Sequence, residues 1–87
     1  MMSPEQRQQA IYDQLQATLH PSLLDVEDES YLHFGHVGHG GAGHFAVKIV
    51  AECFKGKSLI AQHRLVYDAL GDLMGTEIHA LRINAKS

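Results

Sequence analysis

Three regularly spaced histidines are the residues whose type and spacing most clearly suggest metal binding. His33, His36 and His39 recur every three residues in a segment, 33–44, that also holds five glycines. Neutral imidazole is a ready ligand for borderline metals such as zinc and iron. Glycine lets the backbone turn closely around an ion. The segment therefore predicts a metal-binding loop.

The spacing alone leaves a second interpretation open. No Cys or carboxylate within 33–44 completes the closed tetrahedral ligand set of a structural zinc site. A solvated polar loop with only adventitious affinity for nickel or zinc fits the same residues equally well. A zinc-binding loop on an otherwise structural domain is one alternative function that follows from them.

The other histidines stand in more ordinary settings. His44 begins an apolar strand and His63 lies within a helical segment, so both are predicted to be hydrogen-bonded structural imidazoles rather than ligands. His20 precedes a proline and is expected to cap the end of a helix.

No set of residues suggests catalysis. Cys53 follows an apolar strand and is predicted to be a small buried hydrophobe rather than a nucleophile. Gly56-Lys57-Ser58 has the form of the end of a phosphate-binding loop, but Ala51 stands where that pattern requires glycine. We therefore expect a protein that is not an enzyme.

Composition limits the class of protein. With 87 residues, 45% of them hydrophobic and 20% charged, the chain is expected to form a single globular domain over residues 1–87. One cysteine forms no internal disulfide, and no apolar run approaches the roughly 20 residues that cross a bilayer. We expect a cytoplasmic protein without membrane contacts. Its net charge of −3 argues against nucleic-acid binding.

The first helix is predicted from its ends and its apolar stripe. Ser3, Pro4 and Gln6 form the pattern of a capping box, with proline at the first helical position. His20-Pro21 ends the helix, because the residue before a proline disfavours helical backbone. Apolar side chains recur at four-residue spacing: Ile11, Leu15 and Leu19.

Two strands are expected on either side of the His- and Gly-rich segment. Residues 45–50 alternate in the manner of a strand and include several β-branched side chains, which makes this the clearest strand of the chain. A second strand is predicted from Leu23 to Tyr31. Its outer face would be negative, because it carries Asp25, Glu27, Asp28 and Glu29.

The remaining residues supply one more helix and one more strand. After a turn at 54–58, apolar spacing predicts a helix that stops at Gly75, and residues 77–84 form the last strand. The order helix, strand, strand, helix, strand predicts an α+β fold, αββαβ, with a three-stranded sheet covered on one face by two helices. The last strand is expected to run parallel to a neighbour through a right-handed crossover.

Alternation within the last strand assigns its side chains to two faces. Ile78 and Ala80 are predicted to share one face, and His79, Leu81 and Ile83 the other. His79 would then stand at the end of a largely apolar row. Packing against those neighbours is therefore the alternative to any role of His79 as a ligand.

Ordered landmarks over nearly the whole chain, from about Ile11 to Ala85, resemble the BolA-like family. The matching segments are Asp28-Glu29-Ser30-Tyr31-Leu32-His33, His44-Phe45, Phe54-Lys55-Gly56-Lys57-Ser58, His63-Arg64-Leu65-Val66-Tyr67 and Ile78-His79-Ala80-Leu81. The resemblance implies an αββαβ fold similar to a type II KH domain. It also implies a heterodimer with a monothiol glutaredoxin that holds a bridging [2Fe–2S] cluster, in cluster trafficking or iron regulation.

The resemblance also implies which residues bind the cluster. In the family, one iron is bound by the glutaredoxin cysteine and a glutathione thiolate, and the other by a residue of the first interstrand loop and the histidine of the last strand. Here these are His33 and His79, with His36 as the competitor of His33. The family's frequent Arg-His-Arg is Gln62-His63-Arg64 in this chain.

Family likeness supports a different class of function as well. A KH-like fold, and the link of family members to transcription control, imply a nucleic-acid-binding regulator as the alternative. Against it stand the net charge and the lack of the Gly-x-x-Gly loop with which KH domains clamp a nucleic-acid backbone. Five basic residues could still form a patch: Lys55, Lys57, Arg64, Arg82 and Lys86. A homodimer is a further alternative for the chain alone.

Overall fold

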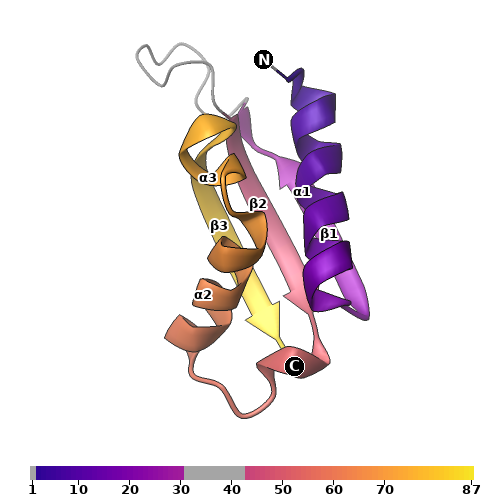
Figure 1. The fold of residues 1–87 in the computed structure, drawn as a ribbon, viewed down its shortest axis with the longest axis vertical. Coiled ribbons are helices and arrows are strands. Elements are labelled where there is room, and N and C mark those ends of the chain that lie inside the picture. The colour runs from indigo at the N-terminus through magenta and orange to yellow at the C-terminus, as the bar shows by residue number, and fades with distance from the viewer. Residues whose placement is uncertain (1, 31–42) are drawn as a thin grey trace.

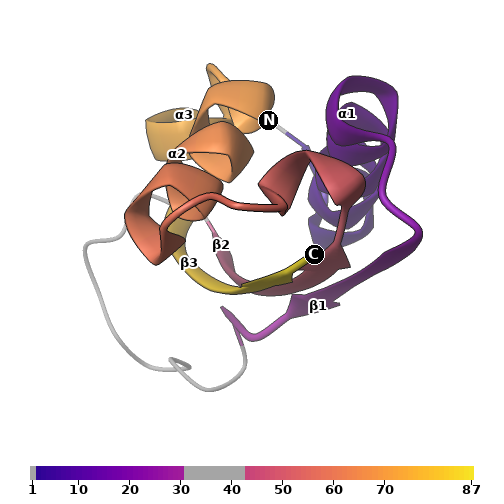
Figure 2. The same cartoon turned by 90° about the horizontal axis from the view of Figure 1, so that it is seen from below.

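Two helices and a short third one cover one face of a three-stranded sheet in the computed structural model, which describes residues 2–30 and 43–87 (Figures 1 and 2). The strands are β1 (Leu23–Asp28), β2 (Gly43–Val50) and β3 (Ile78–Lys86), in the order β1-β2-β3. β2 pairs antiparallel with β1 and parallel with β3. The predicted α+β fold, and the parallel placement of the last strand, are confirmed.

Helix α1 (Pro4–Leu19) begins and ends where its sequence signals stand. The Gln6 backbone N–H donates to Ser3 Oγ, and the Ser3 backbone N–H donates to Gln6 Oε1, which is the predicted capping box. At the other end His20 adopts left-handed backbone, φ 49°, and its N–H donates to the Gln16 carbonyl. Its buried face carries Ile11, Leu15 and Leu19.

Side chains of β2 alternate strictly between the covered and the open face of the sheet. Phe45, Val47 and Ile49 are almost fully buried beneath the helices and lie at the centre of the core. On β1, Val26 is buried whereas Asp25 and Glu27 are exposed. The open face of β1 is therefore negative, as its sequence predicts.

Several boundaries differ from those that the sequence predicts. The second helix is interrupted: α2 (Leu59–Leu70) is capped by Gly71, whose φ of 52° suits glycine, and α3 (Leu73–Thr76) follows as a separate turn. β1 ends at Asp28 rather than Tyr31, because the Asp28 carboxylate accepts the Ser30 N–H in a local turn. β3 extends to Lys86.

Cys53 is exposed, so the prediction that it is buried is wrong. It lies in the short 3₁₀ helix η2 (Glu52–Phe54), which turns the chain away from β2. In this turn Phe54 occupies the core position and is fully buried. The neighbouring Cys53 remains exposed, and its Sγ atom lies 4.0 Å from the Leu19 carbonyl oxygen.

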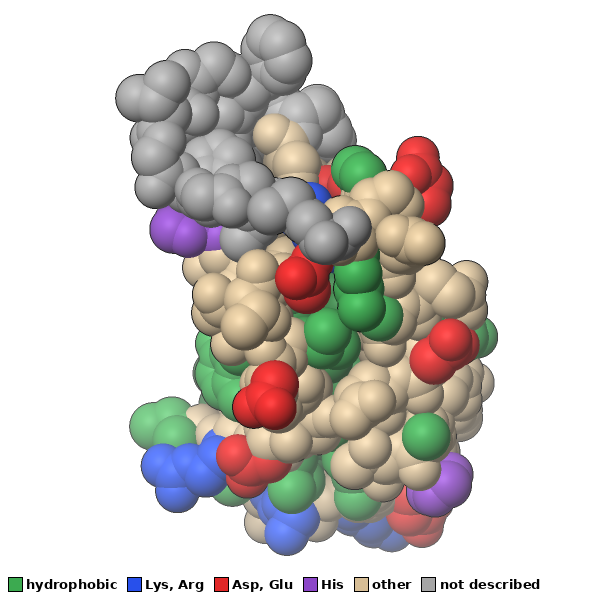
Figure 3. Space-filling view, turned by 45° about the horizontal axis from the view of Figure 1, so that its top comes forward, with side chains coloured by type: hydrophobic (Ala, Val, Ile, Leu, Met, Phe, Trp, Pro, Cys, Tyr) green, Lys and Arg blue, Asp and Glu red, His purple; other side chains and the backbone are tan. Residues whose placement is uncertain are grey.

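Charge is unevenly distributed over the surface. Figure 3 shows Asp and Glu side chains spread over one face of the molecule, whereas most Lys and Arg side chains on that face gather toward its lower end. Lys55 and Lys57 are exposed in the turn after η2. The position of Lys86 follows from a backbone hydrogen bond, in which its carbonyl accepts the N–H of Ala51, the residue before η2. Lys86 therefore lies at the same end of the sheet as that turn.

A buried ion pair between Arg7 and Glu77 links α1 to the residue before β3. Removal of one partner leaves a desolvated charge, so Glu77→Ala should lower the free energy of unfolding by about 3 kcal/mol in a urea titration. The side chains of Arg7 and Glu77 are only 7% and 18% exposed. The exposed carboxylate of Asp68 is the control, and Asp68→Ala should change stability by less than about 0.5 kcal/mol. Equal effects of the two variants would contradict this role.

Candidate functional site

A β-bulge at the start of β3 determines where His79 points. Gly43 is opposite Ile78, but the next residue of β2, His44, is opposite Ala80, so His79 is the extra residue of β3. Ile78 is buried in the core, and Leu81 and Ile83 pack against that core as well. The bulge therefore returns the apolar side chains to the helix-covered face and leaves His79 exposed.

The predicted faces of the last strand are consequently wrong. Ile78 shares the covered face with Leu81 and Ile83, whereas Ala80 is exposed. His79 is not part of the apolar row. Simple alternation fails because one extra residue reverses the assignment of every side chain on one side of the bulge.

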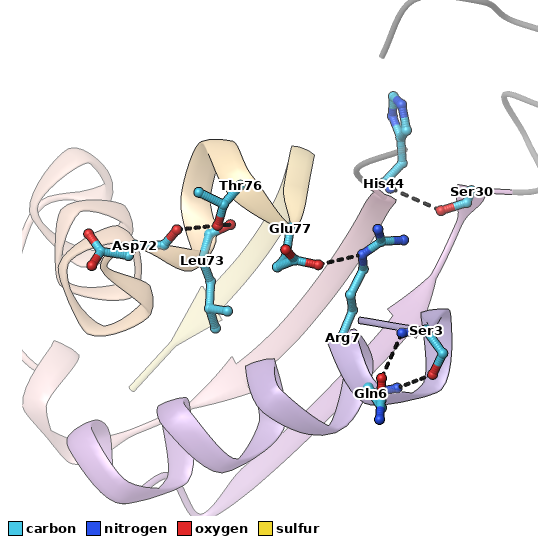
Figure 4. A network of polar contacts seen from close by, with 9 residues as sticks. All are labelled: Ser3, Gln6, Arg7, Ser30, His44, Asp72, Leu73, Thr76 and Glu77. Carbon is cyan, nitrogen blue, oxygen red and sulfur yellow. Dashed lines mark hydrogen bonds and ion pairs between the residues drawn. The ribbon is translucent and has the colours of Figure 1, made fainter. Parts of the chain in front are cut away.

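Contacts at residue 77 hold the bulge in place. The Gly43 N–H donates to the Glu77 carbonyl across 3.0 Å, and the Glu77 N–H donates to the Leu73 carbonyl across 3.0 Å. Arg7 Nε donates to Glu77 Oε1, also across 3.0 Å (Figure 4). Helix α1, α3 and β2 thus all contact Glu77, the residue immediately before β3.

Gly43 is required by close packing. A Cβ atom at this position would lie 2.6 Å from Phe45 Cε2 and 3.1 Å from Ser30 Oγ. No real Cβ makes a contact as short as the first. The glycine thus lets the Phe45 ring and the end of β1 close over the start of β2.

His44 is held at the beginning of β2 through its backbone. Its N–H donates to Ser30 Oγ across 3.1 Å (Figure 4), and its carbonyl accepts the Glu29 N–H across 2.7 Å. The side chain is half-buried and lies on the sheet face that the helices leave open. Its ring centroid is 5.1 Å from that of His79, and the ring planes are inclined by 54°.

The two rings line a pocket of about 380 Å³. Glu29 and Arg82 line it as well, and they form a two-pronged ion pair: Arg82 Nε donates to Glu29 Oε1 across 2.9 Å, and Nη2 donates to Oε2 across 2.6 Å. The Glu29 carboxylate is mostly buried, whereas Arg82 is largely exposed. The pocket therefore combines two imidazoles with a charge-balanced pair.

The other predicted site residues are placed as follows. His33 and His36 lie outside the described residues, as does His39. His63 is half-buried on α2, and its Nε2 atom has no hydrogen-bond partner in the part of the chain that the structure describes. Within residues 2–30 and 43–87 no three His, Cys, Asp or Glu side chains are grouped closely enough to hold a metal ion.

The pairing of His44 with His79 is absent from the sequence-based prediction. The two residues are far apart in the chain and meet only through the parallel register of β2 and β3. Two features of the sequence indicate this proximity: a histidine stands at or near the start of each of the two strands, and a glycine stands just before His44.

Comparison with known proteins assigns the chain to a family. The sequence model described as "BolA-like protein" matches residues 15–87. The chain belongs to the BolA-like family. It is 45% identical over 83 residues to SufE-like protein 1, chloroplastic/mitochondrial, of Arabidopsis thaliana, and this match covers 88% of the chain and 22% of that protein.

Two further similarities support the assignment. The chain is 36% identical over 74 residues to the DNA-binding transcriptional regulator BolA of Escherichia coli K12, a match that covers 85% of the chain and 69% of the relative. The solved BolA domain of SufE1 from Arabidopsis thaliana superposes with a TM-score of 0.80 at 46% identity, over 92% of this chain and 90% of the other. The chain spans 22% and 54% of the length of two Arabidopsis relatives.

Among the described residues, none of the helices has the length and apolar character needed to cross a membrane.

The close contact at Gly43 provides a test of how the site is built. Gly43→Ala should lower the free energy of unfolding by about 1–3 kcal/mol, because the new methyl group overlaps the Phe45 ring. Phe45→Leu alone should also destabilise, since it removes buried ring atoms. Both substitutions together should cost less than the sum of the two, measured by urea denaturation in a double-mutant cycle. Strict additivity would show that the ring and the glycine are not in conflict.

Proposed function

We propose that this BolA-like protein is a non-catalytic partner of a monothiol glutaredoxin and helps to bind a bridging [2Fe–2S] cluster, in cluster trafficking or iron regulation. His79 is one ligand, and His33 or His36 is its counterpart in the family pattern. The observation that carries the proposal is the β-bulge, which takes the His79 imidazole out of the core and exposes it in a pocket beside a second imidazole.

The donor set of the chain fits a cluster that two proteins share. The pocket is lined by two imidazoles and by the Glu29 carboxylate, whose two oxygens are paired with Arg82. The single cysteine, Cys53, follows β2 at the opposite end of the sheet. A [2Fe–2S] cluster with nitrogen ligands on one iron still needs thiolates on the other. A glutaredoxin cysteine and glutathione supply these two thiolates, which is the reason the proposal requires a partner.

Each iron would then have a different environment. Neutral imidazoles in place of thiolates reduce the negative charge around one iron and raise the reduction potential of the cluster. His79 contributes a ligand whose backbone is fixed by the contacts of Gly43 and Glu77. A ligand held in this way needs less ordering when the complex forms.

Reconstitution tests the partnership and His79 together. The chain mixed with a monothiol glutaredoxin, iron, sulfide and glutathione should give a heterodimer with cluster absorption and visible circular dichroism, whereas the chain alone should give no stable cluster. In the heterodimer, His79→Ala should change both spectra. It should leave the melting temperature of the apo chain nearly unchanged, because the side chain is exposed.

Two controls separate a ligand from a structural residue. His63→Gln and Cys53→Ser lie away from the pocket-lining residues and should leave the heterodimer spectra as they are. A stable cluster on the chain without thiol partners would refute the partnership. Unaltered heterodimer spectra in His79→Ala would refute the assignment of His79.

A second candidate function is DNA binding. It is favoured by the similarity to the DNA-binding transcriptional regulator BolA of Escherichia coli and by three exposed basic residues: Lys55 and Lys57 in the turn before α2, and Arg64 within α2. Lys86 lies near the same turn, but Arg82 does not extend this group, because its guanidinium is paired with Glu29 at the opposite end of the sheet. The basic residues predicted as one patch are thus divided.

Salt dependence tests this candidate. If the turn contacts phosphates, the affinity for duplex DNA should fall steeply with salt, and Lys55→Ala/Lys57→Ala should make the slope of log K against log salt shallower by about 2, measured by fluorescence anisotropy. His79→Ala should not change that slope. Absence of binding at low salt would eliminate the candidate.

A further inference from the structure

The two edge strands of the sheet differ in how they are protected. On β1, the Val26 carbonyl accepts a hydrogen bond from Gln8 Nε2 of α1 across 2.7 Å, and Asp25 and Glu27 are exposed on the same strand. Side-chain caps and charges of this kind keep an edge from pairing with another strand. β3 forms the other edge, and within residues 2–30 and 43–87 no further strand lies beyond it (Figure 2).

Backbone groups of three β3 residues point away from β2. In a parallel ladder, alternate residues of a strand direct both their N–H and their carbonyl to the neighbouring strand. The Lys86 carbonyl accepts the Ala51 N–H, which shows that Lys86 faces β2 in this way. By alternation Asn84 and Arg82 face β2 as well. The residues that direct their N–H and carbonyl groups to the open edge are therefore Leu81, Ile83 and Ala85.

The side chains of the same three residues are apolar and half-buried. Leu81, Ile83 and Ala85 lie on the helix-covered face and pack against the core, but each remains partly exposed. Neither a charge nor a proline stands at these positions to oppose pairing with another strand. A strand added beside β3 would cover the three side chains and supply partners for their backbone groups.

The edge is complementary to a second copy of itself. When two β3 strands pair antiparallel about a two-fold axis at Ile83, this residue lies opposite its own copy, and Leu81 lies opposite Ala85 of the second copy. Hydrogen-bonded pairs recur at every second residue of an antiparallel ladder. Each outward N–H and carbonyl of the three residues therefore has a partner in this arrangement.

Charge selects this register over its neighbours. With the axis at Ile83, Arg82 lies opposite Asn84 of the second copy. An axis one residue earlier would place two copies of Arg82 opposite each other. An axis one residue later would place Arg82 opposite Lys86 of the second copy. Like charges directly opposite each other destabilise a pair of strands, so the register at Ile83 is favoured.

We propose that β3 is a self-association surface, through which two copies of the chain form an antiparallel dimer with a continuous sheet of six strands, three from each copy. The helices of both copies lie on the same side of that sheet, because the two-fold axis is perpendicular to it. A short segment of each copy takes part, so the dimer is weak and depends on protein concentration. This surface does not rest on the proposed function.

NMR spectroscopy of the unaltered chain tests the pairing directly, with EDTA present to exclude dimers bridged by metal. As the protein concentration rises to roughly millimolar, amide hydrogen exchange of Ile83 and Ala85 should slow at least about twofold. Exchange of Asn84, whose N–H already faces β2, should not change. In a mixture of ¹³C-labelled and unlabelled chains, an intermolecular NOE should join the Hα atoms of Arg82 and Asn84, because residues in non-hydrogen-bonded antiparallel pairs have Cα atoms about 4.5 Å apart.

Two substitutions test the same edge by sedimentation equilibrium. Ile83→Lys places like charges opposite each other and should weaken the dimer at least about tenfold. Ala85→Pro removes an outward N–H and should also weaken the dimer, whereas the hydrogen bonds between β2 and β3 remain. Leu23→Lys is the matched control: it adds the same charge at an exposed leucine of β1, the opposite edge strand, and should leave the dimer unchanged.

The outcomes decide the proposal even if a variant fails to fold, because the exchange and NOE measurements need no substitution. A chain that stays monomeric at roughly millimolar concentration overturns it. Equal dissociation constants for folded Ile83→Lys and Leu23→Lys, with amide spectra as the check on folding, overturn it as well. So does a dimer whose intermolecular contacts are confined to the exposed apolar side chains of α2, Leu59, Ile60 and Tyr67.

Discussion

The parallel pairing of β2 with β3, with one extra residue at its start, is the constraint on which the rest of the structure depends. It returns Ile78 to the core and leaves His79 outside it. Without the bulge, the same strand would bury an imidazole among leucine and isoleucine, where its polar atoms would need partners. The extra residue therefore keeps the core apolar and exposes the imidazole of the candidate site. Gly43, next to the bulge, leaves space for the Phe45 ring.

Helix α1 contributes to the site although none of its side chains lies there. Arg7 reaches from its first turns to Glu77, immediately before β3, and both side chains are largely buried. A buried ion pair is poor evidence for high stability, because desolvation offsets the attraction, but removal of one partner leaves a buried charge uncompensated. Here it links α1 to the junction between α3 and β3, two residues before His79.

Much of this fold follows from local sequence, and the candidate site does not. The capping box at Ser3, the alternation around Val47 and the crossover to the last strand depend on neighbouring residues, and each is present in the structure. The faces of β3 were predicted wrongly because a bulge arises from pairing with a distant strand. The proximity of His44 to His79 depends on that same register. The exposure of Cys53 depends on which side chain of η2 is buried in the core, and that side chain is Phe54.

The sheet separates two kinds of chemistry along its length. Imidazoles lie where β2 and β3 begin, whereas Lys55, Lys57 and Lys86 lie where they end. Arg82 is near the imidazoles, but its charge is balanced by Glu29. Exposed cations that lie more than a Debye length from a site, about 8 Å at physiological salt, scarcely affect the electrostatic potential there. Cluster ligation and phosphate binding would therefore use opposite ends of β2 and β3, and a change at one end would leave the other largely unaffected.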